Sequence, residues 1–142
     1  MKSFFEIAEA FGVALDKDDF QTAENLIHPD CIYDIVSSQI HGPKTIVSSY
    51  EENMIEGRKK MDELVWGKSY VKALGEYQFE VYFTDYLKHK GISHIHKCKQ
   101  KLTLNEEGMI IKIEHINLAI GFWLLAFGFW LLAIGYWLLA IG

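Results

Sequence analysis

The sequence predicts an α+β domain in which three N-terminal helices pack on one face of a curved antiparallel sheet. Apolar residues recur at three- and four-residue steps in the first part of the chain, as on one face of a helix. Residues 65–118 instead contain runs of β-branched and aromatic residues separated by short turns, which is typical of strands. A third part, residues 119–142, has no charged residue and contains a seven-residue repeat, so we expect a domain at 1–118 and an apolar tail at 119–142.

Composition narrows the classes of protein to which the chain can belong. With 142 residues, 50% hydrophobic and 23% charged, it is globular rather than disordered. The net charge of −5 gives no electrostatic basis for binding nucleic acid, which requires clustered Lys and Arg. Two cysteines do not make a disulfide framework and the N-terminus lacks a signal peptide's apolar run, so a cytoplasmic location is expected. Neither a Gly-rich phosphate loop after a strand nor a Cys-x-x-Cys pair is present, so we expect no cofactor.

The helices follow from spacing and capping signals. Residues 3–15 form an amphipathic helix, which the acidic run at 16–19 ends. A second, short helix spans residues 20–27 and stops before His28-Pro29, because the residue before proline disfavours helix. A strand at 31–36 and a turn at 41–44 precede the third helix, which begins at Pro43 and reaches about Lys60.

The second half of the domain is predicted to be a four-stranded antiparallel meander. Its strands are expected at residues 65–74, 77–89, 92–104 and 109–118. The connections between them are two to four residues long, and such short links join antiparallel neighbours.

Three segments of this pattern, LIHPDCIYD, HGPKTIVSSYEEN and LTLNEEGMIIKIEHINL, resemble the nuclear transport factor 2-like superfamily, which includes ketosteroid isomerase, SnoaL-type polyketide cyclases and scytalone dehydratase. The resemblance covers about residues 3–118 and implies a cone-shaped half-barrel with a central pocket. It also implies that an ungapped alignment puts Asp34 at the general base of ketosteroid isomerase. The oxyanion tyrosine of that enzyme then falls on Ala10, whereas a shift of one residue puts it on Phe11 and moves the general base to Ile35. Its hydrogen-bonding aspartate falls on Gln100. Because no register keeps the whole set, steroid isomerisation is not expected.

Alternation along the strands predicts which side chains face inward. On residues 77–89 the odd positions from Tyr77 to Leu87 are apolar except Asp85, on 92–104 the even positions face inward, and on 109–117 the odd positions do. The inward surface therefore carries a group of polar residues at one end: Asp85, His94, His96, Cys98, Gln100, His115 and Asn117.

Turn length predicts how these residues meet across strands. If Lys90-Gly91 is a two-residue turn, Asp85 lies opposite His96, Leu87 opposite His94 and Phe83 opposite Cys98. A carboxylate facing an imidazole fixes which ring nitrogen carries the proton, an arrangement that suits a general acid or base. If the next loop pairs Leu104 with Met109, Cys98 lies near His115.

Two alternatives stand beside a catalytic pair. Buried polar groups cost about 1–3 kcal/mol each without hydrogen bonds, so Asp85 and His96 can simply satisfy one another. A gathering of seven polar residues at one end of an inward face nevertheless favours a ligand pocket over a purely structural network. His94 and His96 are also spaced to share a divalent cation with His115 or Cys98, but unmetallated pocket histidines are favoured and no metal is expected.

The sequence thus favours an enzyme that moves a proton on a small, largely apolar molecule with a carbonyl or hydroxyl, in isomerisation, dehydration or cyclisation. His96 is the candidate acid or base, Asp85 orients it, and Asp34, Gln100 or His115 polarises the substrate. The other candidate ligand contacts are His94, Cys98, Asn117, Tyr33 and Phe11. One alternative is a non-catalytic binding module or homodimer that associates, as many similar domains do, through the outward-facing residues Ile95, Ile110 and Ile116. A further alternative is a domain that its tail tethers to a membrane.

The tail is expected to be an appendage with no role in the chemistry. As a helix, residues 116–142 would rise roughly 40 Å, enough to cross a hydrocarbon core of about 30 Å, and glycine recurs every seven residues. No Lys or Arg flanks this segment, however, and its Trp residues sit in every repeat. Membrane association or self-association ranks second and a lid over the pocket third, and deleting 119–142 is expected to leave a folded domain.

Overall fold

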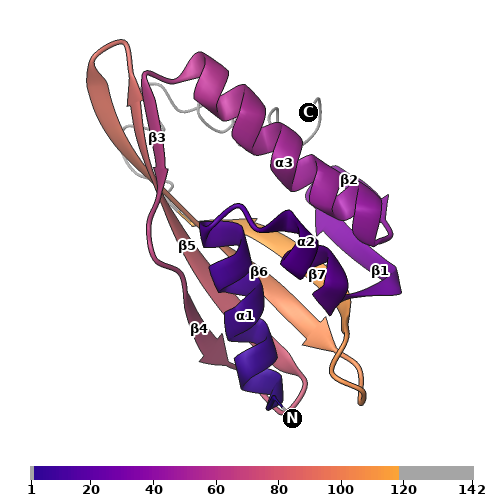
Figure 1. Cartoon of the computed structure of the whole chain (residues 1–142). Coiled ribbons are helices and arrows are strands. Elements are labelled where there is room, and N and C mark those ends of the chain that lie inside the picture. The colour runs from indigo at the N-terminus through magenta and orange to yellow at the C-terminus, as the bar shows by residue number, and fades with distance from the viewer. Residues whose placement is uncertain (1, 119–142) are drawn as a thin grey trace.

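A computed structural model describes residues 2–118, and the predictions made for the tail lie outside this range. The described chain folds as α1 (Phe4–Asp16), α2 (Phe20–Leu26), β1 (Ile27–Ile35), β2 (Ser38–His41) and α3 (Pro43–Lys60), then β3 (Glu63–Trp66), β4 (Tyr70–Ala73), β5 (Gln78–His89), β6 (Ile92–Leu104) and β7 (Ile110–Asn117). Within residues 2–118, no helix combines the length and apolar character needed to span a bilayer. The predicted α+β class, with three helices on a curved sheet, is confirmed (Figure 1).

Local capping explains where the helices begin. The Ser3 hydroxyl accepts from the Glu6 amide at 3.1 Å while Glu6 accepts from the Ser3 amide at 3.3 Å, a reciprocal cap at the start of α1. The Asp19 carboxylate accepts from the Thr22 amide at the start of α2. Pro43 occupies the first turn of α3, as predicted, where its missing N–H costs nothing.

The sheet is mixed, with strand order β2-β1-β7-β6-β5-β3 and β4 also paired to β5. The meander is antiparallel as predicted, but β1 pairs with β7 in parallel. Sequence alternation does not reveal a pairing between strands so far apart in the chain. A short β2 also forms where a loop was expected, because Val36 and Ser37 alone turn β1 back on itself.

The predicted strand at 65–74 is two strands with a break between them. Trp66 pairs with Asp85 in β3, whereas Tyr70 pairs with Tyr82 in β4, so one extra residue lies in the connection. Gly67 makes the break possible, because a Cβ there would lie 2.9 Å from the Tyr86 ring and 3.0 Å from the Thr84 carbonyl oxygen. The shift turns Trp66 and Val71 toward the same face, although their numbers differ in parity.

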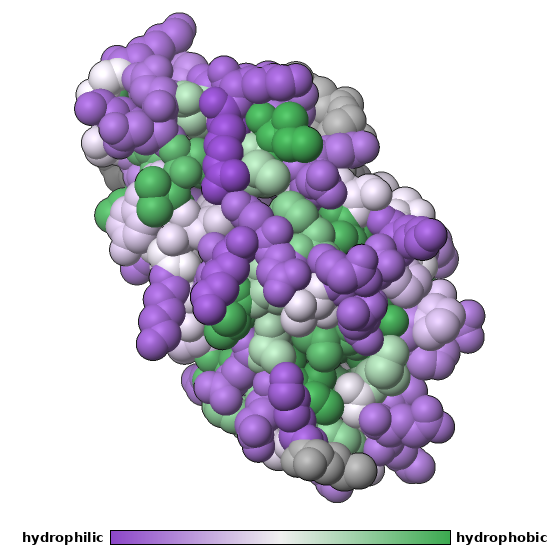
Figure 2. All heavy atoms as spheres, in the orientation of Figure 1, coloured by the Kyte–Doolittle hydropathy of each residue, from purple (hydrophilic) through white to green (hydrophobic). Residues whose placement is uncertain are grey.

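Helices α1 and α3 pack on different parts of the sheet, and α2 contacts both of them (Figure 1). Helix α1 contacts β4 and β5, while α3 contacts β1, β2 and β3. The core fills the layer between helices and sheet, and its largest fully buried members are Tyr33, Phe11, Ile35, Ile46, Leu102, Ile110 and Ile113. Hydrophilic side chains cover much of the face in Figure 2, and hydrophobic ones appear in separate patches between them.

Candidate functional site

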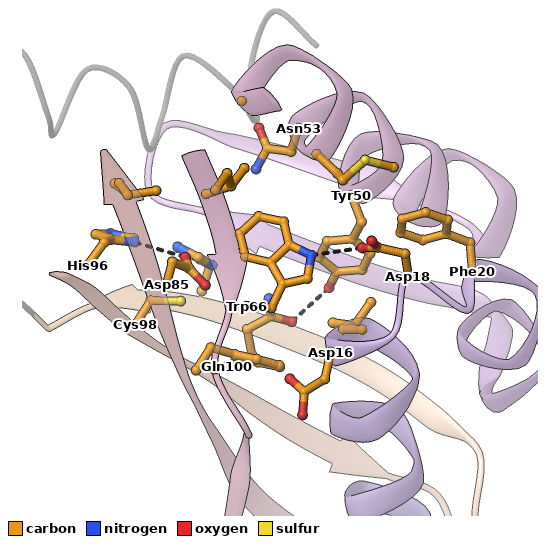
Figure 3. A pocket seen from close by; sticks show the side chains of 18 of the residues that line it. Asp16, Asp18, Phe20, Tyr50, Asn53, Trp66, Asp85, His96, Cys98 and Gln100 are labelled. Carbon is orange, nitrogen blue, oxygen red and sulfur yellow. Dashed lines mark hydrogen bonds and ion pairs between the residues drawn. The ribbon is translucent and has the colours of Figure 1, made fainter. Parts of the chain in front are cut away.

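A cavity of about 140 Å³ lies between the α1–α2 turn, helix α3 and the inner face of the sheet (Figure 3). An apolar cavity of about 150 Å³ is known to hold a benzene molecule, so the space suits one six-membered ring. The wall is mostly apolar and aromatic and carries a few convergent polar groups, as small-molecule sites do. These polar groups include Tyr50, Asn53, Asp85, His96, Gln100 and His115.

The Asp85–His96 pair stands on neighbouring strands in the predicted register. The Lys90-Gly91 turn has positive φ at both residues, and it pairs Asp85 with His96, Leu87 with His94 and Phe83 with Cys98. His96 Nδ1 lies 3.2 Å from Asp85 Oδ2, and the two side chains are 18% and 21% exposed. Because the carboxylate engages Nδ1, Nε2 is the ring nitrogen left to exchange a proton with a ligand.

Gln100 presents a hydrogen-bond donor to the same cavity. Its Oε1 accepts from the Tyr50 hydroxyl at 2.7 Å, a contact drawn in Figure 3, and the residue is 5% exposed. Burial raises the pKa of Tyr50 well above its ordinary value, so the phenol keeps the proton it donates. With Oε1 occupied, the amide N–H groups of Gln100 remain available to a carbonyl oxygen.

His115 is held on both ring nitrogens. The Tyr33 hydroxyl lies 3.2 Å from Nδ1, and Asn117 Oδ1 lies 3.1 Å from Nε2. Burial lowers the pKa of His115, which favours the neutral ring. In that form Nε2–H donates to Asn117 and Nδ1 accepts from Tyr33, so no ring nitrogen is left for a substrate.

Cys98 lines the cavity as a neutral thiol. Burial, with a smaller contribution from the charge of Asp85, raises its pKa well above the ordinary value. A thiolate nucleophile needs the opposite shift. Cys98 therefore contributes to the shape of the wall and not to covalent chemistry.

The opposite wall is built by residues that the sequence did not single out. The Trp66 indole N–H donates to Asp18 Oδ1 at 2.8 Å, and the guanidinium of Arg58 contacts the other oxygen of the same carboxylate at 2.9 Å. Asp18 has a positive φ of 56° between α1 and α2, which directs it toward β3. Asp16 accepts from the amide and hydroxyl of Ser69 at 2.8 and 2.7 Å, fixing α1 to the break between β3 and β4.

Asn53 on α3 is a further residue of the wall that sequence reasoning missed. Its Oδ1 is buried with no hydrogen-bond partner, the sole such side-chain atom among residues 2–118. Figure 3 shows Asn53 on α3 among the side chains that line the cavity. A buried acceptor without a donor costs about 1–3 kcal/mol, and such atoms gather at sites that a ligand completes. The sequence offered one signal for it: Asn53 lies three residues after Tyr50 and four before Gly57, so the three share one face of the helix.

The cavity brings together most, but not all, of the predicted site residues. His96, Asp85, Cys98, Gln100, His115 and Tyr33 line it. Asn117 contacts it only through His115, and His94 lies farther along β6 toward the turn. Phe11 is fully buried in the core. Asp34 does not line the cavity, because buried Tyr33 and Ile35 on either side of it face inward and the strand turns Asp34 the other way.

The predicted contact between Cys98 and His115 is wrong. A bulge between Thr103 and Leu104 pairs Leu104 with Ile110 instead of Met109, so His115 faces Gln100 and Asn117 faces Cys98. The same shift buries Ile110 completely, although an outward position was expected for it. Within residues 2–118, no group of three or more His, Cys, Asp and Glu side chains is arranged to hold a metal ion.

Comparisons with known proteins identify the fold. No family model and no curated protein matches the sequence. Among solved structures, an LEH-like epoxide hydrolase from M. tuberculosis is 18% identical with a TM-score of 0.60, over 94% of this chain and 95% of that one. TerC, co-crystallised with polyporic acid, is 13% identical with a TM-score of 0.61, over 82% and 92%. An NTF2-like protein of unknown function from Cytophaga hutchinsonii is 13% identical with a TM-score of 0.56, over 83% and 92%.

At these identities the likeness shows the fold alone. Proteins described as polyketide cyclases, one of them SnoaL-like, are also among the structural neighbours. The predicted resemblance to the nuclear transport factor 2-like superfamily is therefore confirmed at the level of architecture.

Proposed function

We propose that this protein, whose described residues have the nuclear transport factor 2-like fold, is a cofactor-free enzyme that moves a proton on a small ring-sized molecule. The observation that carries the proposal is a hydrogen-bonded His96–Asp85 pair in the wall of a mostly apolar cavity. Structural neighbours that are described as cyclases and an epoxide hydrolase, together with the co-crystal of TerC with polyporic acid, support a small-molecule ligand.

Each polar group has a distinct role in this proposal. His96 Nε2 takes a proton from a carbon or hydroxyl of the substrate and returns it to another atom of the same molecule or to a leaving hydroxyl. Asp85 holds the ring and stabilises its charged form. The Gln100 amide donates to the substrate carbonyl, where negative charge develops during transfer. Isomerisation, dehydration and cyclisation share these steps.

Cyclohex-3-en-1-one tests the proposal, since it is one ring in size and becomes the conjugated enone when a proton moves. We expect conversion above the buffer rate, followed by ultraviolet absorbance. His96→Gln, which keeps the volume but loses the basic nitrogen, should lower the rate by about 10²–10⁴-fold. His41→Gln is the matched control, because His41 is exposed and lies outside the cavity. Equal rates for wild type and His96→Gln would remove His96 from the mechanism.

A second candidate function is association of two copies through the outer face of the sheet. Ile95, Tyr86 and Ile116 are 48%, 48% and 38% exposed there, on adjacent strands β5, β6 and β7. This apolar group favours a homodimer in which the cavity only binds. Light scattering of wild type against Ile95→Lys tests it. If wild type and Ile95→Lys are both monomeric at micromolar protein concentrations, this candidate function is contradicted.

A further inference from the structure

The charged side chains that line the cavity are mostly negative. Asp16, Asp18 and Asp85 all contribute to the wall, and none of the described residues that line it is Lys or Arg. The phenols of Tyr33 and Tyr50 donate inside the protein, to His115 and Gln100. A ligand therefore meets three carboxylates and the amide oxygen of Asn53, together with the donors that Gln100 and His96 supply.

Compensating cations are fewer than the carboxylates. Arg58 pairs with Asp18 from outside the lining, and His96 pairs with Asp85. Among residues 2–118, the hydrogen bonds to Asp16 come from the neutral Ser69. His115 adds no charge, because burial lowers its pKa and both nitrogens are engaged. The wall stays negative whether His96 is protonated or neutral, and the chain as a whole carries −5.

Two further features favour a ligand that donates hydrogen bonds. Asn53 Oδ1 is buried beside the cavity without a donor, so a hydroxyl or amine of the ligand can satisfy it. Aromatic rings of Phe20, Trp66 and Phe83 line the space, and ring faces attract cations. Both features disfavour a carboxylate, which has no donor and carries the same sign as the wall.

We infer that the cavity selects its ligand by charge, admitting neutral and cationic molecules with a hydroxyl or amine and excluding carboxylates of the same size. The inference rests on the proposed ligand site and names the class of molecule that occupies it. Partly enclosed sites focus the field of such charges, so the discrimination extends beyond direct contact.

Three single-ring probes of similar size test it: benzylamine, benzyl alcohol and benzoate, titrated into the full chain at pH 7 and followed by chemical shifts of the Gln100 and Asn53 side-chain amides. We expect benzylamine and benzyl alcohol to bind at least about tenfold more tightly than benzoate, which is about 1.4 kcal/mol. The ratio of the affinity for benzylamine to that for benzoate should shrink between about 0.1 M and 1 M salt, because the screening length shortens from about 10 Å to 3 Å.

Asp16→Asn removes one wall charge and keeps both contacts with Ser69 possible, so the ratio of amine to acid should fall severalfold. Asp30→Asn makes the same change of net charge at an exposed position outside the cavity and should leave the ratio unchanged. Benzoate binding as tightly as benzylamine, or an equal fall in both variants, would overturn the inference while the ligand site stands. Binding of none of the three probes would instead end the proposed ligand site itself.

Discussion

Replacing Tyr33 with Phe tests whether the hydrogen bonds that join Tyr33, His115 and Asn117 stabilise the fold. The substitution removes one hydroxyl from a residue with no exposed surface and leaves the ring packed against Tyr50, 5.3 Å between centroids. His115 Nδ1, part-buried on the cavity wall, then loses its donor at 3.2 Å. Stranding a buried acceptor costs about 1–3 kcal/mol. At roughly 4 °C per kcal/mol for a domain of this size, Tm should fall by about 4–12 °C.

Urea unfolding followed by circular dichroism measures the change for Tyr33→Phe. Tyr86→Phe is the matched control: Tyr86 is 48% exposed on the outer face of β5, so the same loss of a hydroxyl should stay within about 0.5 kcal/mol. If Tyr33→Phe costs no more than Tyr86→Phe, the hydroxyl does not donate to His115. The assignment of His115 as a neutral ring, closed to substrate, would then fail with it.

Three other changes give separate checks. Because the folded state lowers the pKa of His115, the unfolded chain takes up a proton first as pH falls below about 6.5. The free energy of unfolding should therefore drop in that range by at most about 1.4 kcal/mol per pH unit. Urea midpoints of His115→Gln, measured over the same pH range, should lack this slope. Gly12→Ala places a Cβ 2.6 Å from the Ser69 hydroxyl, so we expect a loss of about 1–3 kcal/mol in thermal unfolding, whereas Gly75→Ala, with no atom within 4 Å, should be nearly neutral. Asn53→Leu removes the unpartnered buried oxygen and should raise the free energy of unfolding of the free protein by up to about 1–3 kcal/mol. In calorimetry the same variant should bind benzyl alcohol more weakly, relative to toluene, than wild type does. A variant less stable than wild type would contradict this.

The part of the site that the sequence could predict is the part fixed by local geometry. A two-residue turn at Lys90-Gly91 sets the register of the whole β5–β6 hairpin, so a contact eleven residues apart, Asp85 with His96, follows from counting. The helices follow similarly from apolar spacing and from Pro43 in the first turn of α3.

The missed features all depend on single backbone irregularities. A bulge at Thr103 and Leu104 changes which residue of β6 lies opposite each residue of β7, and nothing in the alternation of that strand marks it. A left-handed Asp18 and a break at Gly67 bring Asp18 and Trp66 together from segments 48 residues apart. Patterns of hydrophobicity report on regular strands and helices, so contacts made by turns and breaks lie beyond them.

The place of β7 in the sheet has a consequence for how the chain is made. This strand lies between β1 and β6, yet it is the last of the described strands to leave the ribosome. Until it arrives, β1 and β2 form one ribbon, β3 to β6 form another, and no ladder joins them. The wall that holds His115 cannot close before β7 emerges, so until then a nascent chain exposes the edges of both ribbons, and aggregation there competes with completion of the domain.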